Sequence, residues 1–152
     1  MIEKLRLNKE FRRVYGRGKS FVDGAVVTYV LGNRSDTNRV GITVSKKLGS
    51  AVLRNRAKRL LTAAFFECLP NVKSGYDIVF VARSRIFTKK SYDVANIMKK
   101  HFISAGMWNA KASSVQIFLA VTGAYLRADA GLALRHHGIA EGHHVHAQSQ
   151  HT

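Results

Sequence analysis

The chain has 152 residues, and its 25 Lys and Arg outnumber its 9 Asp and Glu, which gives a formal net charge of +16 at pH 7. The single cysteine, Cys68, excludes an intramolecular disulfide, and we expect its thiol in the core or at its boundary. No apolar run approaches the ~20 residues that span a bilayer. The N-terminus lacks the apolar core of a signal peptide, so we expect a cytoplasmic protein with no membrane partner.

The positive charge is concentrated in the first 107 residues, which hold 22 basic and 7 acidic residues, against 3 and 2 in the remainder. A field of this size attracts nucleic acid, anionic membranes or acidic proteins. With 46% hydrophobic residues the chain can also bury a real core. We therefore predict one basic domain over residues 1–107, followed by an atypical, His-rich extension over residues 108–152.

The first predicted element is a short N-terminal helix. Asn8 is a suitable N-cap, and Gly16 can end the helix in a left-handed conformation. Between them, apolar side chains recur at helical spacing, namely Phe11, Val14 and Tyr15. Phe11 and Tyr15 either pack in the core or line a groove in which unpaired bases stack.

Two strands are predicted next, over residues 25–31 and 39–44, because both stretches are rich in β-branched residues. Residues 32–36 carry turn-forming side chains, so we expect the two strands to pair as an antiparallel hairpin. Tyr29 lies on one face of the first strand, where it is either a core aromatic or a stacking platform.

A long helix is predicted from Ser50, its expected N-cap, to about residue 69. The helical repeat of its sequence separates an apolar face from a basic face. The apolar face carries Leu53, Ala57, Leu60, Leu61 and Ala64. The basic face carries Arg54, Asn55, Arg56, Lys58 and Arg59, and the turn before the helix adds Lys46 and Lys47.

The cations of this basic face repel one another, since no acidic residue occurs between residues 45 and 66. Solvated helix faces usually mix both signs of charge. We therefore interpret the face as a polyanion-binding surface in preference to ordinary solvated surface. Arg56 lies nearest the apolar arc, which leaves open that it packs toward the edge of the core.

The last part of the basic domain predicts a strand and a third helix. Residues 76–82 are nearly all apolar, as expected of a strand that is covered on both faces inside a sheet. Thr88 or Ser91 can cap the helix, and Gly106 can stop it. Its predicted apolar stripe comprises Tyr92, Ala95, Met98 and Phe102.

The extension that begins at Trp108 contains six of the seven histidines. Five of them lie close together, and we expect at most opportunistic chelation of zinc, nickel or copper because no fixed metal-site spacing occurs. These residues are His136, His137, His143, His144 and His146. We predict a disordered or loosely helical extension.

No catalytic set stands out in the basic domain. A two-metal nuclease needs several carboxylates to hold its ions, whereas the acidic residues here are thinly scattered and His101 is the only histidine before the extension. We therefore predict no catalytic residue and no metal site in this chain, and we interpret the domain as a binding module.

The segment SKKLGSAVLRNRAKRLL, residues 45–61, closely resembles the signature of the bacterial ribonuclease P protein component. Further stretches fall in the family's order and spacing, namely KLRLNKEFRRVYGRGKSF, TYVL, RVGITVSKK and YDIVFVAR, so the similarity covers about residues 1–107. The resemblance implies a single small α/β domain, an α+β two-layer sandwich of order α-β-β-β-α-β-α. Its four-stranded sheet includes one more strand near Phe21, as in ribosomal protein S5 domain 2-like folds.

The resemblance also implies a function and a set of binding residues. The chain is expected to be the protein subunit of ribonuclease P, in which the RNA subunit carries the active site and uses Mg²⁺ to remove the 5′ leader of precursor tRNA. The residues implied to contact the RNA subunit are Lys46, Lys47, Arg54, Asn55, Arg56, Lys58 and Arg59. The residues implied to line a leader-binding cleft, between the central helix and the sheet, are Phe11, Arg12, Tyr15, Lys19 and Tyr29.

Three other functions remain open at this point. The protein could be a ribosomal or general RNA-binding protein of similar fold, a DNA-binding protein, or a free-standing metallonuclease. The Arg54-Asn55-Arg56 motif speaks against the first of these, and the shortage of carboxylates speaks against the last. Within ribonuclease P we expect a monomeric protein in a 1:1 ribonucleoprotein.

Overall fold

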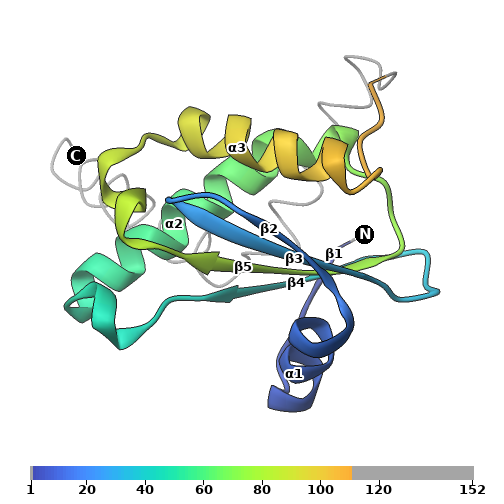
Figure 1. Cartoon of the computed structure of the whole chain (residues 1–152), viewed down its shortest axis with the longest axis horizontal. Coiled ribbons are helices and arrows are strands. Elements are labelled where there is room, and N and C mark those ends of the chain that lie inside the picture. The colour runs from blue at the N-terminus through green and yellow to red at the C-terminus, as the bar shows by residue number, and fades with distance from the viewer. Residues whose placement is uncertain (1, 111–152) are drawn as a thin grey trace, which may run out of the picture.

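The computed structural model describes residues 2–110 of the chain. The strands are β1 (Ile2–Lys4), β2 (Lys19–Val22), β3 (Val26–Gly32), β4 (Asn38–Thr43) and β5 (Tyr76–Ala82). The α-helices are α1 (Asn8–Arg17), α2 (Ala51–Cys68) and α3 (Ser91–Ser104). Short 3-10 helices occur at η1 (Lys46–Leu48), η2 (Leu69–Asn71) and η3 (Ser84–Thr88). Together these elements form one mixed α/β domain (Figure 1).

Strand β5 lies at the centre of the sheet, whose order is β1-β4-β5-β3-β2. It pairs in parallel with β4 and antiparallel with β3. The predicted hairpin between residues 25–31 and 39–44 is therefore wrong, because β5 is inserted between the two strands. Burial explains the order, since Ile78, Val79 and Phe80 are fully buried and only an inner strand is covered so completely.

The two edge strands differ in how well the resemblance anticipated them. The expected strand near Phe21 is present as β2, which pairs antiparallel with β3. Strand β1 is additional, since four strands were expected and the described residues form five. It is only three residues long and pairs in parallel with β4 at the edge of the sheet, so the fold class is unchanged.

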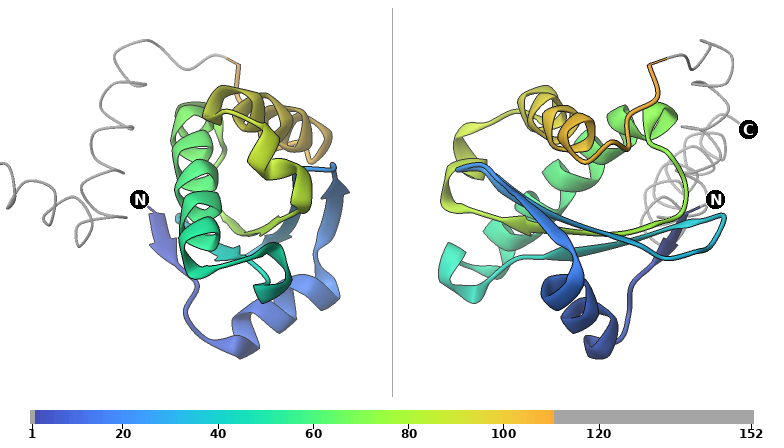
Figure 2. Two further views of the ribbon diagram at one scale, coloured as in Figure 1. Left: turned by 90° about the vertical axis from the view of Figure 1, so that its left-hand side faces the viewer. Right: turned by 45° about the vertical axis from the view of Figure 1, so that its right-hand side comes forward.

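Helices cover both faces of the sheet (Figures 1 and 2). On one face α2 and α3 enclose the larger core, in which Phe65 and Phe102 pack with Phe80 of β5. On the other face α1 packs through Val14 against Val79 of β5. The side-chain period of two along β5 supplies both cores. The expected two-layer packing thus holds for the α2–α3 side, and α1 covers the opposite face.

The limits of α1 differ from the prediction at both ends. The N-cap is Leu7 rather than Asn8, and the capping acceptor is Glu10, whose Oε2 accepts from the Leu7 amide at 3.0 Å. The helix also continues through Gly16 to its last residue, Arg17. Polar sequence patterns locate a helix end only to within a residue or two.

The start of α3 is likewise capped from inside the helix. Neither Thr88 nor Ser91 is the cap, since the N-cap is Lys90, whose amide donates to Asp93 Oδ2 at 3.0 Å. The predicted end is confirmed, because Gly106 follows the helix with a φ of 72°, in the left-handed region.

The predicted stripe of α3 is correct in three of its four positions. Its buried members are Ala95, Met98 and Phe102. Tyr92, however, is 55% exposed, and Val94 is fully buried instead. An aromatic residue in the first turn of a helix can satisfy the spacing rule and still lie beyond the edge of the core.

Contacts continue past residue 107, where we placed the domain boundary. Trp108 forms an antiparallel bridge with Val72, and the Asn109 amide donates to Asn71 O at 2.6 Å. The predictions of disorder and of metal chelation by the tail histidines concern residues outside the described part of the chain. Among residues 2–110, no helix combines the length and apolar character needed to cross a membrane.

Candidate nucleic-acid interface

Helix α2 holds a basic surface rigidly against the core. Ser50 is its N-cap, as predicted, with its hydroxyl accepting from the Leu53 amide at 3.4 Å. On the inner side of the helix Ala57, Leu61 and Ala64 are fully buried. The residues on the outer side, with the two lysines of η1, form what we call the α2 basic surface: Lys46, Lys47, Arg54, Asn55, Arg56, Lys58 and Arg59.

The lysines of the α2 basic surface are positioned by the turn that precedes the helix. The Ser45 hydroxyl accepts from the Lys47 amide at 3.2 Å and so starts η1. Gly49 then adopts a φ of 129°, and a Cβ there would lie 2.7 Å from Leu53 Cδ1. Only glycine fits this turn without strain, and the turn places Lys46 and Lys47 next to the first turn of α2.

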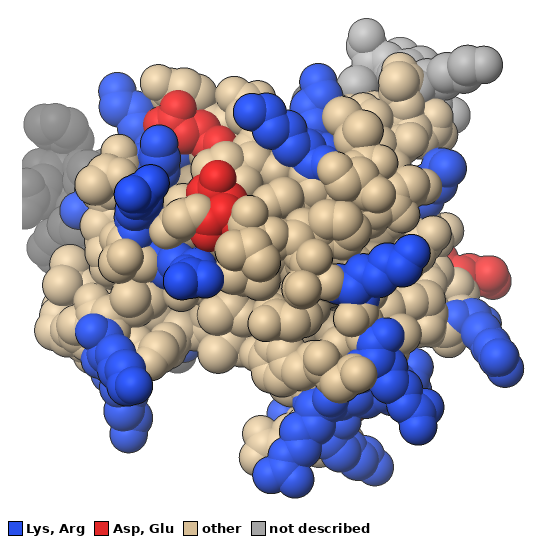
Figure 3. Space-filling model, in the orientation of Figure 1, with Lys and Arg blue, Asp and Glu red and all other residues tan. Residues whose placement is uncertain are grey.

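The cations of the α2 basic surface have no acidic partner among residues 2–110, where ion pairs occur only at Arg13 and Arg39. Arg56 is exposed, so the alternative that it packs toward the core edge is wrong. Arg54 is instead the half-buried member, and its Nε is buried without a hydrogen-bond partner. Figure 3 shows basic side chains gathered where η1 lies and, separately, over α1.

The predicted aromatic residues come together on the opposite face of the sheet. The Tyr15 and Tyr29 rings meet edge-on with centroids 4.9 Å apart, and the Phe11 and Tyr15 centroids are 6.5 Å apart. The predicted location between the central helix and the sheet is wrong, because Phe11 and Tyr29 pack against the core under α1, whereas α2 lies on the other face. The site is therefore formed by α1 and the sheet.

Of these aromatic residues, Tyr15 is the most available to a ligand. Its side chain is 38% exposed, and its hydroxyl lies 2.9 Å from Thr43 Oγ1, which fixes the ring over β4. The Phe11 ring is packed onto the backbone of Gly41, where a Cβ would lie only 2.5 Å from Phe11 Cε1. Phe11 and Tyr29 are both half-buried against the small core under α1, and Tyr15 is the exposed member of the group.

Arg12 lies on α1, the helix that carries Phe11 and Tyr15, whereas Lys19 is directed away from this aromatic group. Arg12 is exposed on α1. Lys19 is opposite Val30, whose side chain belongs to the core on the α2–α3 side, so the period of two directs Lys19 to that side as well. Ser20 is the residue opposite Tyr29. We call Arg12, Tyr15 and Tyr29, with Phe11 beneath them, the α1 surface.

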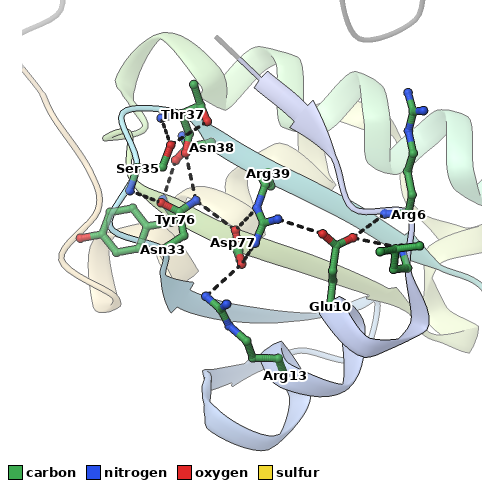
Figure 4. A network of polar contacts seen from close by, with 11 residues as sticks. Arg6, Glu10, Arg13, Asn33, Ser35, Thr37, Asn38, Arg39, Tyr76 and Asp77 are labelled. Carbon is green, nitrogen blue, oxygen red and sulfur yellow. Dashed lines mark hydrogen bonds and ion pairs between the residues drawn. The ribbon is translucent and has the colours of Figure 1, made fainter.

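A polar network that our sequence reasoning missed joins α1 to the sheet (Figure 4). Asp77 is 1% exposed, and its carboxylate accepts from Arg39 Nε at 2.8 Å and Nη2 at 2.6 Å. Arg39 Nη1 donates to Glu10 Oε1 at 2.9 Å, and Arg13 Nη2 lies 3.7 Å from Asp77 Oδ2. The side-chain amide of Asn33 donates a further hydrogen bond to Asp77 Oδ1 at 3.0 Å. An acidic residue within an otherwise apolar strand was the signal available in the sequence.

The pKa values of these groups follow from their contacts. Burial raises the pKa of Asp77, but hydrogen bonds from Arg39 and Asn33 outweigh it, and the net shift is downward. The amides of Leu7 and Arg6 lower the pKa of Glu10. Asp77 in turn raises the pKa of Arg39, so all three groups are ionised at neutral pH.

Two other titratable groups are buried away from both surfaces. Cys68 is 3% exposed, as expected of a core thiol, and burial raises its pKa to about 12. His101 Nδ1 lies 2.9 Å from the Thr28 hydroxyl, and burial lowers the pKa of this histidine. Among residues 2–110, no group of three or more His, Cys, Asp and Glu residues is placed to hold a metal ion.

Comparison with known proteins gives a consistent result. The profile of the Ribonuclease P family matches residues 2–106. The ribonuclease P protein component of Clostridium botulinum strain Langeland is 43% identical over 107 residues, which cover 70% of this chain and 96% of that protein. That of Clostridioides difficile is 46% identical over 105 residues, covering 66% of this chain and 92% of that protein.

Solved structures extend the similarity to the fold. The RNase P protein of Staphylococcus aureus superposes with a TM-score of 0.62 at 32% identity, covering 70% of this chain and 97% of that protein. The RNase P protein of Thermotoga maritima superposes with a TM-score of 0.59 at 28% identity, covering 65% of this chain and 94% of that protein. The family match and these two sets of relatives span the same basic domain, so the chain belongs to the ribonuclease P protein family.

Proposed function

We propose that this chain is the protein subunit of ribonuclease P and assists a catalytic RNA in removing the 5′ leader from precursor tRNA. Family membership supports a role in tRNA processing. The observation that carries the proposal is the α2 basic surface, a rigid helical face whose cations have no acidic partner among residues 2–110. Such a face gains its neutralising charge from a polyanion.

The α2 basic surface is proposed to bind the RNA subunit. Exposed arginines such as Arg56 and Arg59 can donate two parallel hydrogen bonds to a phosphate, and Lys58 supplies a point charge. Asn55 lies between them and can hydrogen-bond to sugar or base. Because the helix is fixed through its buried side, RNA binding has to order the side chains of these donors but not their backbone.

The α1 surface is proposed to bind the leader. Leader sequences vary, so the site must accept any base, and stacking on an aromatic ring meets that need because every base has a π-face. Tyr15 and Tyr29 lie together on the face of the sheet that α1 covers, with Tyr15 exposed, and the exposed Arg12 of α1 offers charge to the backbone of the strand. This arrangement supports a single-strand site with little sequence preference.

In this proposal the RNA subunit holds the active site, and Mg²⁺ is bound by that RNA and the substrate. The carboxylates near the α1 surface support this assignment, because Asp77 is engaged by Arg39 and Asn33 and Glu10 caps its helix. The positive charge of the protein would lower the repulsion between the phosphates of the two RNAs and thereby the magnesium concentration that cleavage requires. We propose one protein per RNA subunit, acting in the cytoplasm.

The test is cleavage of precursor tRNA at low magnesium by a bacterial ribonuclease P RNA, with and without the chain. The chain should restore leader removal and should cleave nothing by itself. The Arg54→Ala/Arg59→Ala variant should fail to restore cleavage, whereas Lys99→Ala/Lys100→Ala, which removes two exposed lysines of α3, should behave as wild type. A chain that binds RNA but leaves the RNA subunit unstimulated would contradict the proposal and favour a general RNA-binding role.

A further inference from the structure

We infer that the connected side chains Asp77, Arg39 and Glu10 are positioning residues for the single strand, because they hold α1 where Tyr15 and Arg12 can reach it. This inference rests on the proposed function, in which the α1 surface binds the leader. None of the three needs to touch RNA for this role.

The inner end of the connection is fixed in the sheet. Asp77 sits in the central strand with its side chain 1% exposed. Arg39 of the neighbouring strand donates two roughly parallel hydrogen bonds to it, at 2.8 and 2.6 Å. This fork-to-fork geometry fixes the plane of the guanidinium as well as its position. Asn33 adds a third hydrogen bond at 3.0 Å, which holds the carboxylate itself in place.

The outer end of the connection reaches the first turn of α1. The remaining terminal nitrogen of Arg39, Nη1, donates to Glu10 Oε1 at 2.9 Å. Glu10 Oε2 accepts from the amides of Arg6 and Leu7 at 2.9 and 3.0 Å. One guanidinium therefore joins the central strand to the capping carboxylate of the helix. A lysine could not make this link, because an ammonium has no planar fork.

An apolar contact lies directly beside this polar link. Phe11 follows Glu10 in the chain, and its ring packs onto Gly41 so closely that a Cβ there would lie 2.5 Å from Phe11 Cε1. Helix α1 has only ten residues, too few to be stable in isolation. Its place on the sheet therefore depends on such contacts, and the link from Glu10 to Arg39 fixes one end of it.

The proposed single-strand site depends on the position of α1 on the sheet. Tyr15 lies one helical turn beyond Phe11, and its hydroxyl meets Thr43 Oγ1 at 2.9 Å. Its ring also meets the Tyr29 ring edge-on, with the two ring centroids 4.9 Å apart. Both contacts join α1 to strands of the sheet, so a shift of the helix would separate the two rings that the proposed stacking requires.

The sharpest test cuts the link at its outer end with Glu10→Gln. The amide oxygen of Gln can still accept from the helix amides, but the charge that faces Arg39 is lost. Removing a negative charge would by itself strengthen binding to RNA, whereas loss of positioning would weaken it. The matched control is Glu67→Gln, the same change at an exposed residue near the end of α2. A pure charge effect of Glu10→Gln would therefore raise the affinity for RNA, and a loss of positioning would lower it.

The measurement is the leader gain, defined as the dissociation constant of leaderless tRNA divided by that of the same tRNA with a leader of about five nucleotides. It is made with the full chain assembled with the RNA subunit. Glu10→Gln should reduce the leader gain about fivefold, the loss of roughly one stacked base. Affinity for leaderless tRNA should stay the same, and Glu67→Gln should keep the full leader gain. Arg39→Lys, which keeps the charge but not the fork, should behave as Glu10→Gln does.

Two outcomes would overturn the inference. A leader gain that stays within about twofold of wild type in Glu10→Gln and Arg39→Lys would show that α1 is positioned without the link. A purely structural role would instead lower the affinity for tRNA equally with and without the leader, and excess protein would reverse this loss. If wild type itself has no leader gain, the proposed leader site fails first, so the two failures are distinguishable.

Discussion

The α2 basic surface and the α1 surface use arginine in contrasting ways. On α2 the guanidiniums of Arg56 and Arg59 are exposed, and no acidic partner occurs among residues 2–110. Beside α1, Arg39 is half-buried, and its three nitrogens donate to Asp77 and Glu10. The first arrangement leaves positive charge for an external polyanion, and the second uses the charge to hold two elements together.

The contrast shows that the charge of a basic protein need not all serve binding. An arginine paired with a buried carboxylate contributes no net charge to the surface field but sets the geometry of its surroundings. An unpaired arginine contributes to the field and to its salt dependence. The first three effects each arise on one side of this contrast, and the last arises at His101, away from both.

The largest effect is expected at the buried carboxylate. Asp77→Ala leaves Arg39 without its inner partner and should lower the free energy of unfolding by about 3–5 kcal/mol. Urea denaturation at pH 7 measures this loss. Asp36→Ala, an exposed acid in the loop between β3 and β4, is the control and should change little. A loss under about 1 kcal/mol for Asp77→Ala, the size of a surface ion pair, would contradict the buried role.

The next effect is on binding of the RNA subunit. Arg54→Ala/Arg59→Ala removes two of the charge-assisted contacts that we propose, and it should weaken binding by about 3 kcal/mol. The slope of log K against log salt should also become shallower by about 2. Titrations at several salt concentrations give both values, with Lys99→Ala/Lys100→Ala as the control. An unchanged slope would mean that these arginines do not contact phosphate.

A smaller effect is expected at the aromatic pair. Tyr15→Ala should cost about 2 kcal/mol of leader binding, because one stacking surface is lost. Tyr15→Phe keeps the ring and loses only the hydroxyl contact to Thr43, so it should retain most of the affinity. Fluorescence titration with a labelled single-stranded leader measures both. Equal losses in the two variants would assign the role to the hydroxyl instead of the ring.

The smallest effect is a pH dependence that arises away from both surfaces. Burial places the pKa of His101 below the ordinary value of 6.5, so below pH 6.5 the unfolded chain takes up a proton that the folded chain does not. The contribution of His101 to stability is therefore fully present above pH 6.5. As the pH is lowered further, the free energy of unfolding should fall by at most about 1.4 kcal/mol per pH unit, until the pKa of the folded state is reached. His101→Gln should remove this slope in thermal unfolding between pH 6.5 and pH 5, and a slope that persists would exclude His101 as its source.

The sequence predicted the features that depend on neighbouring residues. The Ser50 cap, the two faces of α2, the inner position of β5 and the stop at Gly106 all follow from local patterns, and all are confirmed. The sequence did not predict the features that depend on pairing between strands distant in the chain. The order β4-β5-β3 carries no local signal, and the hairpin expectation failed for that reason.

The same limit explains the errors in the candidate site. Lys19 was grouped with Arg12 because it is nearby in sequence, but the register of β2 against β3 directs it to the other face. Arg39 resembles any other basic residue until β4 is placed beside β5, which brings it to Asp77. The three predicted aromatic residues do lie together, but the helix beside them was predicted wrongly, because the face of the sheet that each helix covers is decided only by the assembled fold.

The central claim is that the two surfaces meet different RNAs, and site-specific cross-linking tests it most directly. A Cβ at Gly16 of α1 would meet nothing within 4 Å, so Gly16→Cys can carry a photoactivated cross-linker, as can Asn55→Cys on α2. The native Cys68 is buried, with a pKa raised to about 12, and should not react. With the assembled complex, we predict cross-links from position 16 to the leader and from position 55 to the RNA subunit. Cross-links from both positions to the same RNA, or the reverse assignment, would contradict the account.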